Sequence, residues 1–147
     1  MRLLGCAWIV LQLAGAQTLA STSAEAHLKQ AAAYQSAGDS RRAIAELRQA
    51  LELKPDLRDA HGILGEILLA QGFAAEAVPH LERAGHVHSQ AVGLIELNRL
   101  PEALRLLLPL YGKRPSDPEI LFHLGETSGK LMKQVFDCRS RKFGSTW

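Results

Sequence analysis

The sequence contains very little cysteine and few aromatic residues, and both scarcities limit what the chain can be. Its two cysteines, Cys6 and Cys138, lie at opposite ends of the 147 residues, so we expect no disulfide bond between them. Phe, Trp and Tyr make up only 5% of the residues, whereas apolar residues make up 47%. This composition suits thin helices that pack through alanine and leucine. A chain of this length is expected to form one domain at most.

The short motifs that mark common active sites are also missing. No Gly-x-Ser-x-Gly segment occurs, and no Ser, His and Asp follow the order or spacing of a hydrolase triad. The glycines are spaced singly, so no glycine-rich phosphate loop is present. Glutamates alternate with Arg and Lys along the expected helices, which is typical of a solvated face. We therefore expect a protein that is not an enzyme and has no cofactor.

A basic surface along the body of the chain is missing as well. The formal net charge is +2, but residues 130–147 alone carry +4, and Arg2 adds +1. Subtracting both leaves −3 for the rest of the chain. Because no basic face spans this part, we expect no nucleic-acid partner.

The amino-terminal segment 1–16 is typical of a secretory signal peptide. Arg2 precedes an apolar run from Leu3 to Ala16, and small residues occupy the positions before an expected cleavage at Gln17. The run is shorter than the roughly 20 residues that span a bilayer, so we expect no stable membrane span. The alternative is that this segment forms a buried first helix of the fold. The signal favours a periplasmic or secreted protein, with residues 17–23 as a linker.

The main feature of the sequence is a stretch that repeats. Residues 24–55 read as two short amphipathic helices joined by a turn at Gly38, with apolar residues at spacings of three and four. When the sequence is shifted along itself by one constant offset, the landmarks of this stretch coincide with later ones. The matched pairs are His27 and His61, Ala31 and Gly65, Tyr34 and Leu68, Gly38 and Gly72, Ala43 and Ala77, Leu47 and Leu81, and Ala50 and Ala84. A fixed period of about 34 residues predicts stacked helical hairpins.

Beyond Ala84 the period shortens, because Ala77 now corresponds to Ala103 and Leu81 to Leu107. Asn98 takes the place of Gly72 as the left-handed turn residue, a helix runs from Pro101 to Lys113, and Pro115 ends its unit as Pro55 does. We expect a further turn at 128–129. The predicted repeat domain covers 24–129, with units 24–57, 58–84, 85–117 and a partial unit 118–129. It is followed by a basic, degenerate or truncated tail over 130–147.

These landmarks resemble the tetratricopeptide repeat family. The likeness rests on a small residue early in the first helix, an aromatic residue or Leu three positions later, Gly at the turn, Ala-x-x-x-Leu-x-x-Ala in the second helix and a closing Pro. It is good over residues 24–84 and weaker beyond. The resemblance implies an all-α, right-handed solenoid of about three and a half antiparallel helix pairs. It also implies protein binding as the style of function.

In such a solenoid the first helices line a concave groove that would bind a peptide segment or a partner protein. The residues expected to line it are Leu28, Ala32, Gln35, Gly62, Glu66, Leu69, Ile95, Phe122 and Glu126. None is the Lys, Arg or Asn with which the chaperone-binding members grip terminal carboxylates, so we expect no carboxylate clamp. Apolar groove residues beside Glu66 and Glu126 favour a partner with apolar anchors and basic flanks.

The sequence also bears on metal binding, on self-association and on an alternative function. His86 and His88 could share a metal ion only in an extended segment, and no third ligand is near, so we expect no metal site. Leu131, Val135 and Phe136 have no following hairpin to cover them, which predicts self-association or fraying there. The alternative to a binding module is a truncated regulatory or docking portion of a larger protein or enzyme.

Overall fold

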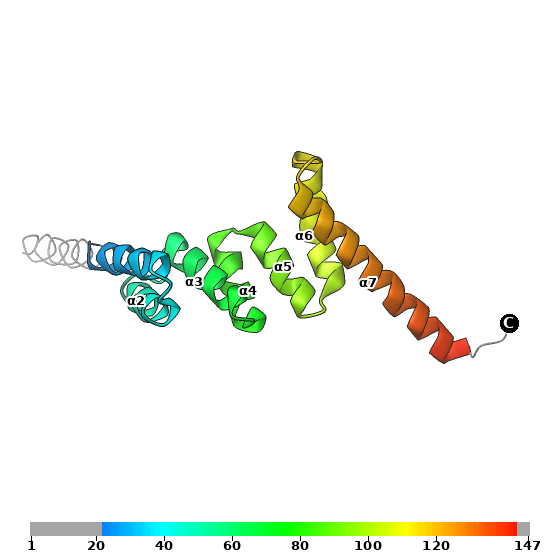
Figure 1. Cartoon of the computed structure of the whole chain (residues 1–147), viewed down its shortest axis with the longest axis horizontal. Coiled ribbons are helices and arrows are strands. Elements are labelled where there is room, and N and C mark those ends of the chain that lie inside the picture. Colours follow the sequence, from blue (N-terminus) through cyan, green and yellow to red (C-terminus); the bar gives the residue numbers. More distant parts are fainter. Residues whose placement is uncertain (1–21, 144–147) are drawn as a thin grey trace, which may run out of the picture.

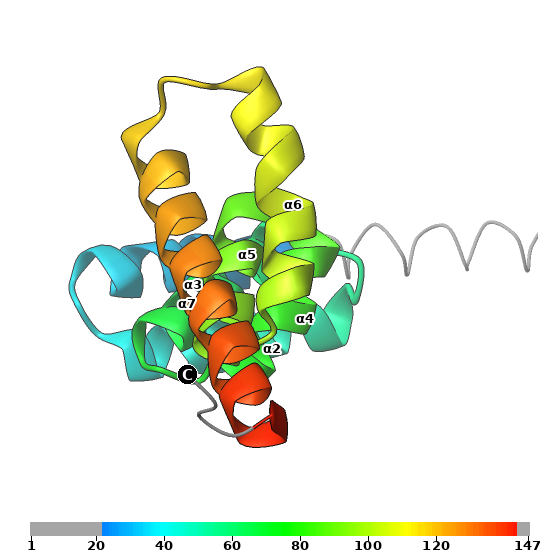
Figure 2. The same cartoon turned by 90° about the vertical axis from the view of Figure 1, so that its right-hand side faces the viewer.

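The chain folds as a stack of helices. The computed structural model describes residues 22–143, which form seven helices and no strand. The first helix covers residues 22–36, and the others are α2 (Ser40–Leu53), α3 (Arg58–Ala70), α4 (Ala74–Ala84), α5 (Val87–Glu96), α6 (Leu100–Lys113) and α7 (Pro118–Phe143). From α2 to α7, helices contact only neighbours one or two places away in sequence. Figure 1 shows this succession along the long axis, and Figure 2 shows it end-on. The expected all-α solenoid is confirmed.

The turns between helices form where the sequence predicts them. Gly38 and Gly72 adopt φ values of 78° and 81°, and Asn98 takes the same left-handed region at 58°. This conformation ends a helix cheaply for Gly and at a small cost for Asn. The Asp39 carboxylate accepts a hydrogen bond from the backbone N–H of Arg42 at 3.1 Å and so caps α2.

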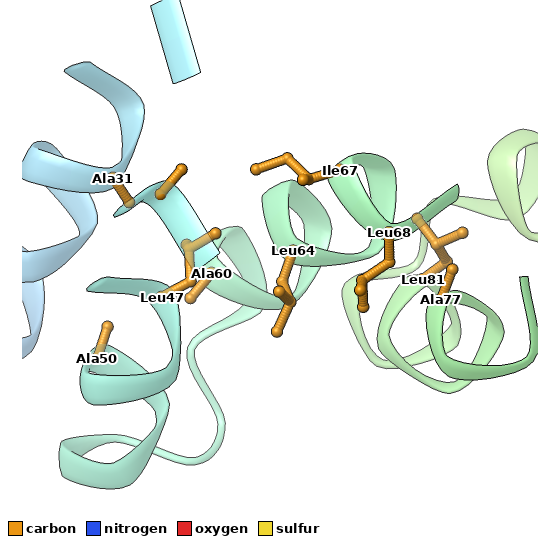
Figure 3. Packing of buried hydrophobic residues seen from close by; sticks show 10 residues of the cluster. Ala31, Leu47, Ala50, Ala60, Leu64, Ile67, Leu68, Ala77 and Leu81 are labelled. Carbon is orange, nitrogen blue, oxygen red and sulfur yellow. The ribbon is translucent and has the colours of Figure 1, made fainter. Parts of the chain in front are cut away.

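A first core lies between the first two hairpins. Figure 3 shows its side chains, half of which are alanines. Its members are Ala31, Ala43, Leu47, Ala50, Ala60, Leu64, Ile67, Leu68, Ala77 and Leu81. Small residues let the helices approach closely: a Cβ atom on Gly65 would lie 2.7 Å from Cγ and Cδ2 of Leu81. Close approach in this core therefore depends on the missing side chain of Gly65.

A second core lies further along the stack. It consists of Val78, Ala91, Leu94, Ile95, Leu100, Ala103 and Leu107. The two cores meet where α5 crosses α4, because a Cβ atom on Gly93 would lie 2.8 Å from Cγ2 of Val78 and 3.4 Å from Cδ1 of Leu69. The stack thus has two cores, each built from residues close in sequence.

The carboxyl-terminal part differs from the expectation. The predicted turn at 128–129 is wrong, and so is the degenerate tail as far as residue 143, because α7 is one helix of 26 residues. A Ser-Gly pair lowers helix propensity by only about 1–2 kcal/mol. Lys130 bonds Glu126 at 2.7 Å across the pair, and Glu119 in the first turn complements the helix dipole. Residues 132–139 are all exposed, and Figure 1 shows this half of α7 extending away from the other helices.

The amino-terminal expectations lie mainly outside the described residues. The predicted signal peptide (1–16), Cys6 and most of the linker (17–23) fall there. Residues 22 and 23 are already helical, so the linker does not extend to residue 23. Cys138, on α7, is an exposed free thiol. None of the helices within 22–143 has the length and apolar character that crossing a bilayer requires.

Candidate partner-binding groove

The predicted groove residues come from four helices and differ in how far they reach solvent. Ala32 and Gln35 on the first helix, Glu66 on α3 and Phe122 on α7 are exposed. Leu28, Leu69 and Glu126 are partly buried, and the two leucines pack against the first core. The structure therefore leaves a surface open on the first helix, on part of α3 and on α7.

Ile95 was expected to line the groove, but the prediction that its side chain is exposed is wrong. Its side chain is only 5% exposed and belongs to the second core. The cause is the environment of α5, the shortest of the labelled helices, which contacts α3, α4, α6 and α7. A helix enclosed by four neighbours has no open apolar face, so Ile95 is removed from the candidate surface.

Gly62 and Glu66 form one contact with the residue that precedes α5. A Cβ atom on Gly62 would lie 2.8 Å from Cε1 of His86, so the missing side chain makes room for this imidazole. Nδ1 of His86 in turn lies 2.9 Å from Oε1 of Glu66, within hydrogen-bond distance. Gly62 thus leaves space for the imidazole of His86 to pack against α3. The carboxylate of Glu66 already has a hydrogen-bond partner in the same imidazole.

The predicted groove residues on α7 lie in and beside a cluster of aromatic and imidazole rings. The rings of Phe122 and His123 meet edge to face, with centroids 5.2 Å apart, and His88 on α5 lies 5.3 Å from His123. Glu126 accepts a hydrogen bond from Lys130, which holds the pKa of this carboxyl below its usual range. His86 and His88 belong to separate contacts. Within 22–143 no three His, Cys, Asp or Glu side chains are grouped as metal ligands would be.

A pair of repeat-related contacts was not found by sequence reasoning. Nδ1 of His27 lies 2.7 Å from Oε2 of Glu46, and Nδ1 of His61 lies 2.8 Å from Nδ1 of His80. His61 and His80 are the repeat equivalents of His27 and Glu46, so the same contact site holds an imidazole–carboxylate pair in one unit and an imidazole pair in the next. The repeat offset, applied to every polar residue, would have indicated this equivalence.

The surroundings of the histidine pair favour one tautomer of the neutral His61 ring. His61 is only 4% exposed, and its Nε2 lies 2.9 Å from the carbonyl oxygen of Pro55, to which only an N–H can donate. In the neutral ring, Nδ1 of His61 then accepts from Nδ1–H of His80. Burial lowers the pKa of His80, as do the positive charges of a protonated His61 and of Arg83. His80 also lines a surface hollow of about 340 Å³ between α2, α3 and α4.

Comparisons with known proteins agree with this architecture. A family model described as tetratricopeptide repeat matches residues 28–85. The crystal structure of YrrB, described as a TPR protein with an unusual peptide-binding site, is similar with a TM-score of 0.64 at 22% sequence identity. The match covers 69% of this chain and 56% of that chain, and at this identity it shows the fold alone. No curated protein matches the sequence.

Proposed function

Because this chain is a tetratricopeptide-repeat protein, with its family match over residues 28–85, we propose that it is a non-enzymatic module that binds a peptide segment of a partner protein in the groove of its first helices. Proteins of this fold typically act by protein binding, and the repeats here supply the scaffold for it. The groove surface, from the first helix to α7, supplies the proposed site.

The observation that carries the proposal is the low charge of this surface. The groove residues that reach solvent include the uncharged Ala32, Gln35 and Phe122, with Leu28 and Leu69 partly open beside them. The two carboxylates, on Glu66 and Glu126, are bonded to His86 and Lys130. An uncharged surface loses little on desolvation, and the centres of protein interfaces are depleted of charge for this reason.

The chemistry of the groove also indicates the kind of peptide. No Lys or Arg occupies the proposed contact positions, so a terminal carboxylate would find no partner there. A peptide with apolar anchors suits the surface at Leu69 and Phe122, and basic flanks suit a body whose net charge is −3. Basic residues beside the anchors of such a peptide would share the carboxylates of Glu66 and Glu126 with His86 and Lys130.

The test is selection from a displayed library of random short peptides, followed by affinity measurement with one enriched peptide. We expect Ala32→Arg, which places bulk and charge in the groove, to weaken binding by at least about tenfold. Ala75→Arg is the matched control, because Ala75 is also an exposed alanine but lies on α4, a second helix. Retained affinity in Ala32→Arg, or equal loss in both variants, would place the site elsewhere.

Export is a separate part of the proposal and rests on the leader. A single Arg, an apolar run and small residues before Gln17 have the order of a cleavable signal. When the chain is made in a secreting bacterial host, mass spectrometry should find a product that begins near residue 17. A soluble product that keeps Met1 would contradict export.

A further inference from the structure

Helix α7 has two apolar faces, and only one of them is covered. Ile120 and Thr127 are 1% and 0% exposed and face the neighbouring helices, with Leu124 and Leu131 partly buried beside them. On the other side lies a stripe that we call the open band, with Met132, Phe136, Phe122, Val135 and Leu121 exposed by 74%, 67%, 66%, 62% and 46%. At about 100° per residue, the band is centred roughly 120° from the covered face. An exposed helix side is normally polar, so this band requires a cause.

The second unit shows what such a face packs against. In α3, Gly65 receives the side chain of Leu81 from α4, the second helix of its hairpin. Gly125 stands ten residues after Pro115, as Gly65 does after Pro55, but nothing lies within 4 Å of where its Cβ would be. Gly129 is equally open. Each glycine costs the helix up to about 1 kcal/mol relative to Ala, and no contact within the described chain explains that cost.

We propose that the open band is the interface of a dimer in which the α7 helices of two copies of this chain pack antiparallel. In this arrangement the carboxyl-terminal half of one α7 occupies, on the other copy, the position that α4 occupies on α3. Its side chains then fill the space beside Gly125. The inference goes beyond peptide binding. Phe122 belongs to both surfaces, so the dimer would cover the α7 end of the groove and leave its residues on the first helix and α3 for a peptide.

The order of residues in the band is self-complementary, which is what a two-fold interface requires. Members on either side of the midpoint between Ser128 and Gly129 lie at equal distances from it. In an antiparallel pair this places each residue level with its counterpart along the axis of the second copy: Leu121 with Phe136, Phe122 with Val135, and Gly125 with Met132. Large apolar side chains thus fill the same levels of the interface, and Met132, central in the band, enters the open space beside Gly125 as Leu81 packs on Gly65.

The charges of α7 favour the antiparallel direction. Residues 118–129 carry two glutamates and no Lys or Arg, whereas residues 130–139 carry three basic residues and one acidic residue. An antiparallel pair places acidic halves beside basic halves, whereas a parallel pair places like charges together. Glu126 and Lys133 flank the same edge of the band, so each would meet the other across the interface. The charge pattern along α7 therefore favours a second copy of this chain as the partner of the open band.

The first test is the mass in solution, measured by sedimentation over a dilution series. We expect a dimer that dissociates on dilution, and Met132→Glu should raise its dissociation constant by at least about tenfold, because each substitution occurs twice. Phe73→Glu is the control, since Phe73 is 56% exposed but lies outside α7. Circular dichroism verifies that both variants remain helical. A wild-type monomer at every concentration, or a dimer that survives Met132→Glu, would refute the interface.

A second test uses cysteines to determine the direction of the helices. In an antiparallel pair the two copies of Cys138 are about 28 Å apart, at 1.5 Å per residue, so mild oxidation should not link them. The variant Ser128→Cys, combined with Cys138→Ser, places two thiols near the crossing point and should link readily. All of these chains carry Cys6→Ser. A disulfide-linked dimer through Cys138, without one through position 128, would show parallel packing and overturn the proposal.

Discussion

Leu81→Ala is expected to lower the free energy of unfolding by about 2–5 kcal/mol. Leu81 is completely buried, belongs to the first core and packs directly on Gly65, so its removal leaves a cavity at the closest approach of α3 and α4. Domains of this size are stable by only about 5–15 kcal/mol, so the loss is a large share of the total. Urea titration followed by far-UV circular dichroism measures it.

The same substitution at an exposed leucine provides the control. Leu108 on α6 is 58% exposed, so Leu108→Ala should change the free energy of unfolding by no more than about 0.5 kcal/mol. Helix propensity is alike in both variants, and the difference between them therefore reports burial alone. Equal losses at the two positions would mean that Leu81 is not part of a packed core.

The wild-type protein should become less stable as the pH falls through the range of histidine titration. Folding lowers the pKa of His80 from its usual value of 6.5, so the folded chain binds its proton less readily than the unfolded chain does. Full stability is therefore present above pH 6.5, and below it protonation of the unfolded chain favours unfolding. The loss continues until the pH has passed below the folded-state pKa. Urea midpoints at pH 7.5 and 5.5 measure the effect.

The substitution His80→Glu tests whether the histidine pair causes this loss of stability in acid. The first repeat already carries a glutamate at the equivalent position, Glu46. The variant would give the second unit the imidazole–carboxylate pair that His27 and Glu46 form in the first. The variant lacks the imidazole at position 80 whose pKa folding lowers, so acid should cost it less stability than the wild type. If both proteins lose stability equally between the two pH values, the histidine pair is not the source.

The helical hairpins and their turns were predictable because they depend on local chemistry. Gly38, Gly72 and Asn98 mark left-handed turns by residue type, and Asp39 marks a cap. The turn expected at 128–129 does not form, because a single glycine only lowers the stability of a helix and does not end it. The residues around this glycine favour a helix. A turn of the kind formed at Gly38 and Gly72 needs the left-handed conformation, which Gly129 does not adopt.

Contacts between helices were less predictable, as two positions show. Ile95 has the periodicity of a groove residue, but its burial depends on how four other helices surround α5. The pairing of His61 with His80 depends on the register of α3 against α4, which the repeat offset encodes only if both partners are compared together. The periodicity of one helix predicts which residues share a face. Which of these faces stays exposed to solvent depends on how the neighbouring helices pack.

The separation into two cores also determines the order in which the protein can form during synthesis. The first core ends at Leu81, so at least residues 82–147 are still to be added when its last member is incorporated. At about 5–20 residues per second, a ribosome needs roughly 3–13 s for this remainder. Helical structures with local contacts fold in milliseconds or less. The amino-terminal hairpins can therefore be complete before the carboxyl-terminal helices exist, and α5 then packs onto a surface, at Val78 and Leu69, that nascent folding has already built.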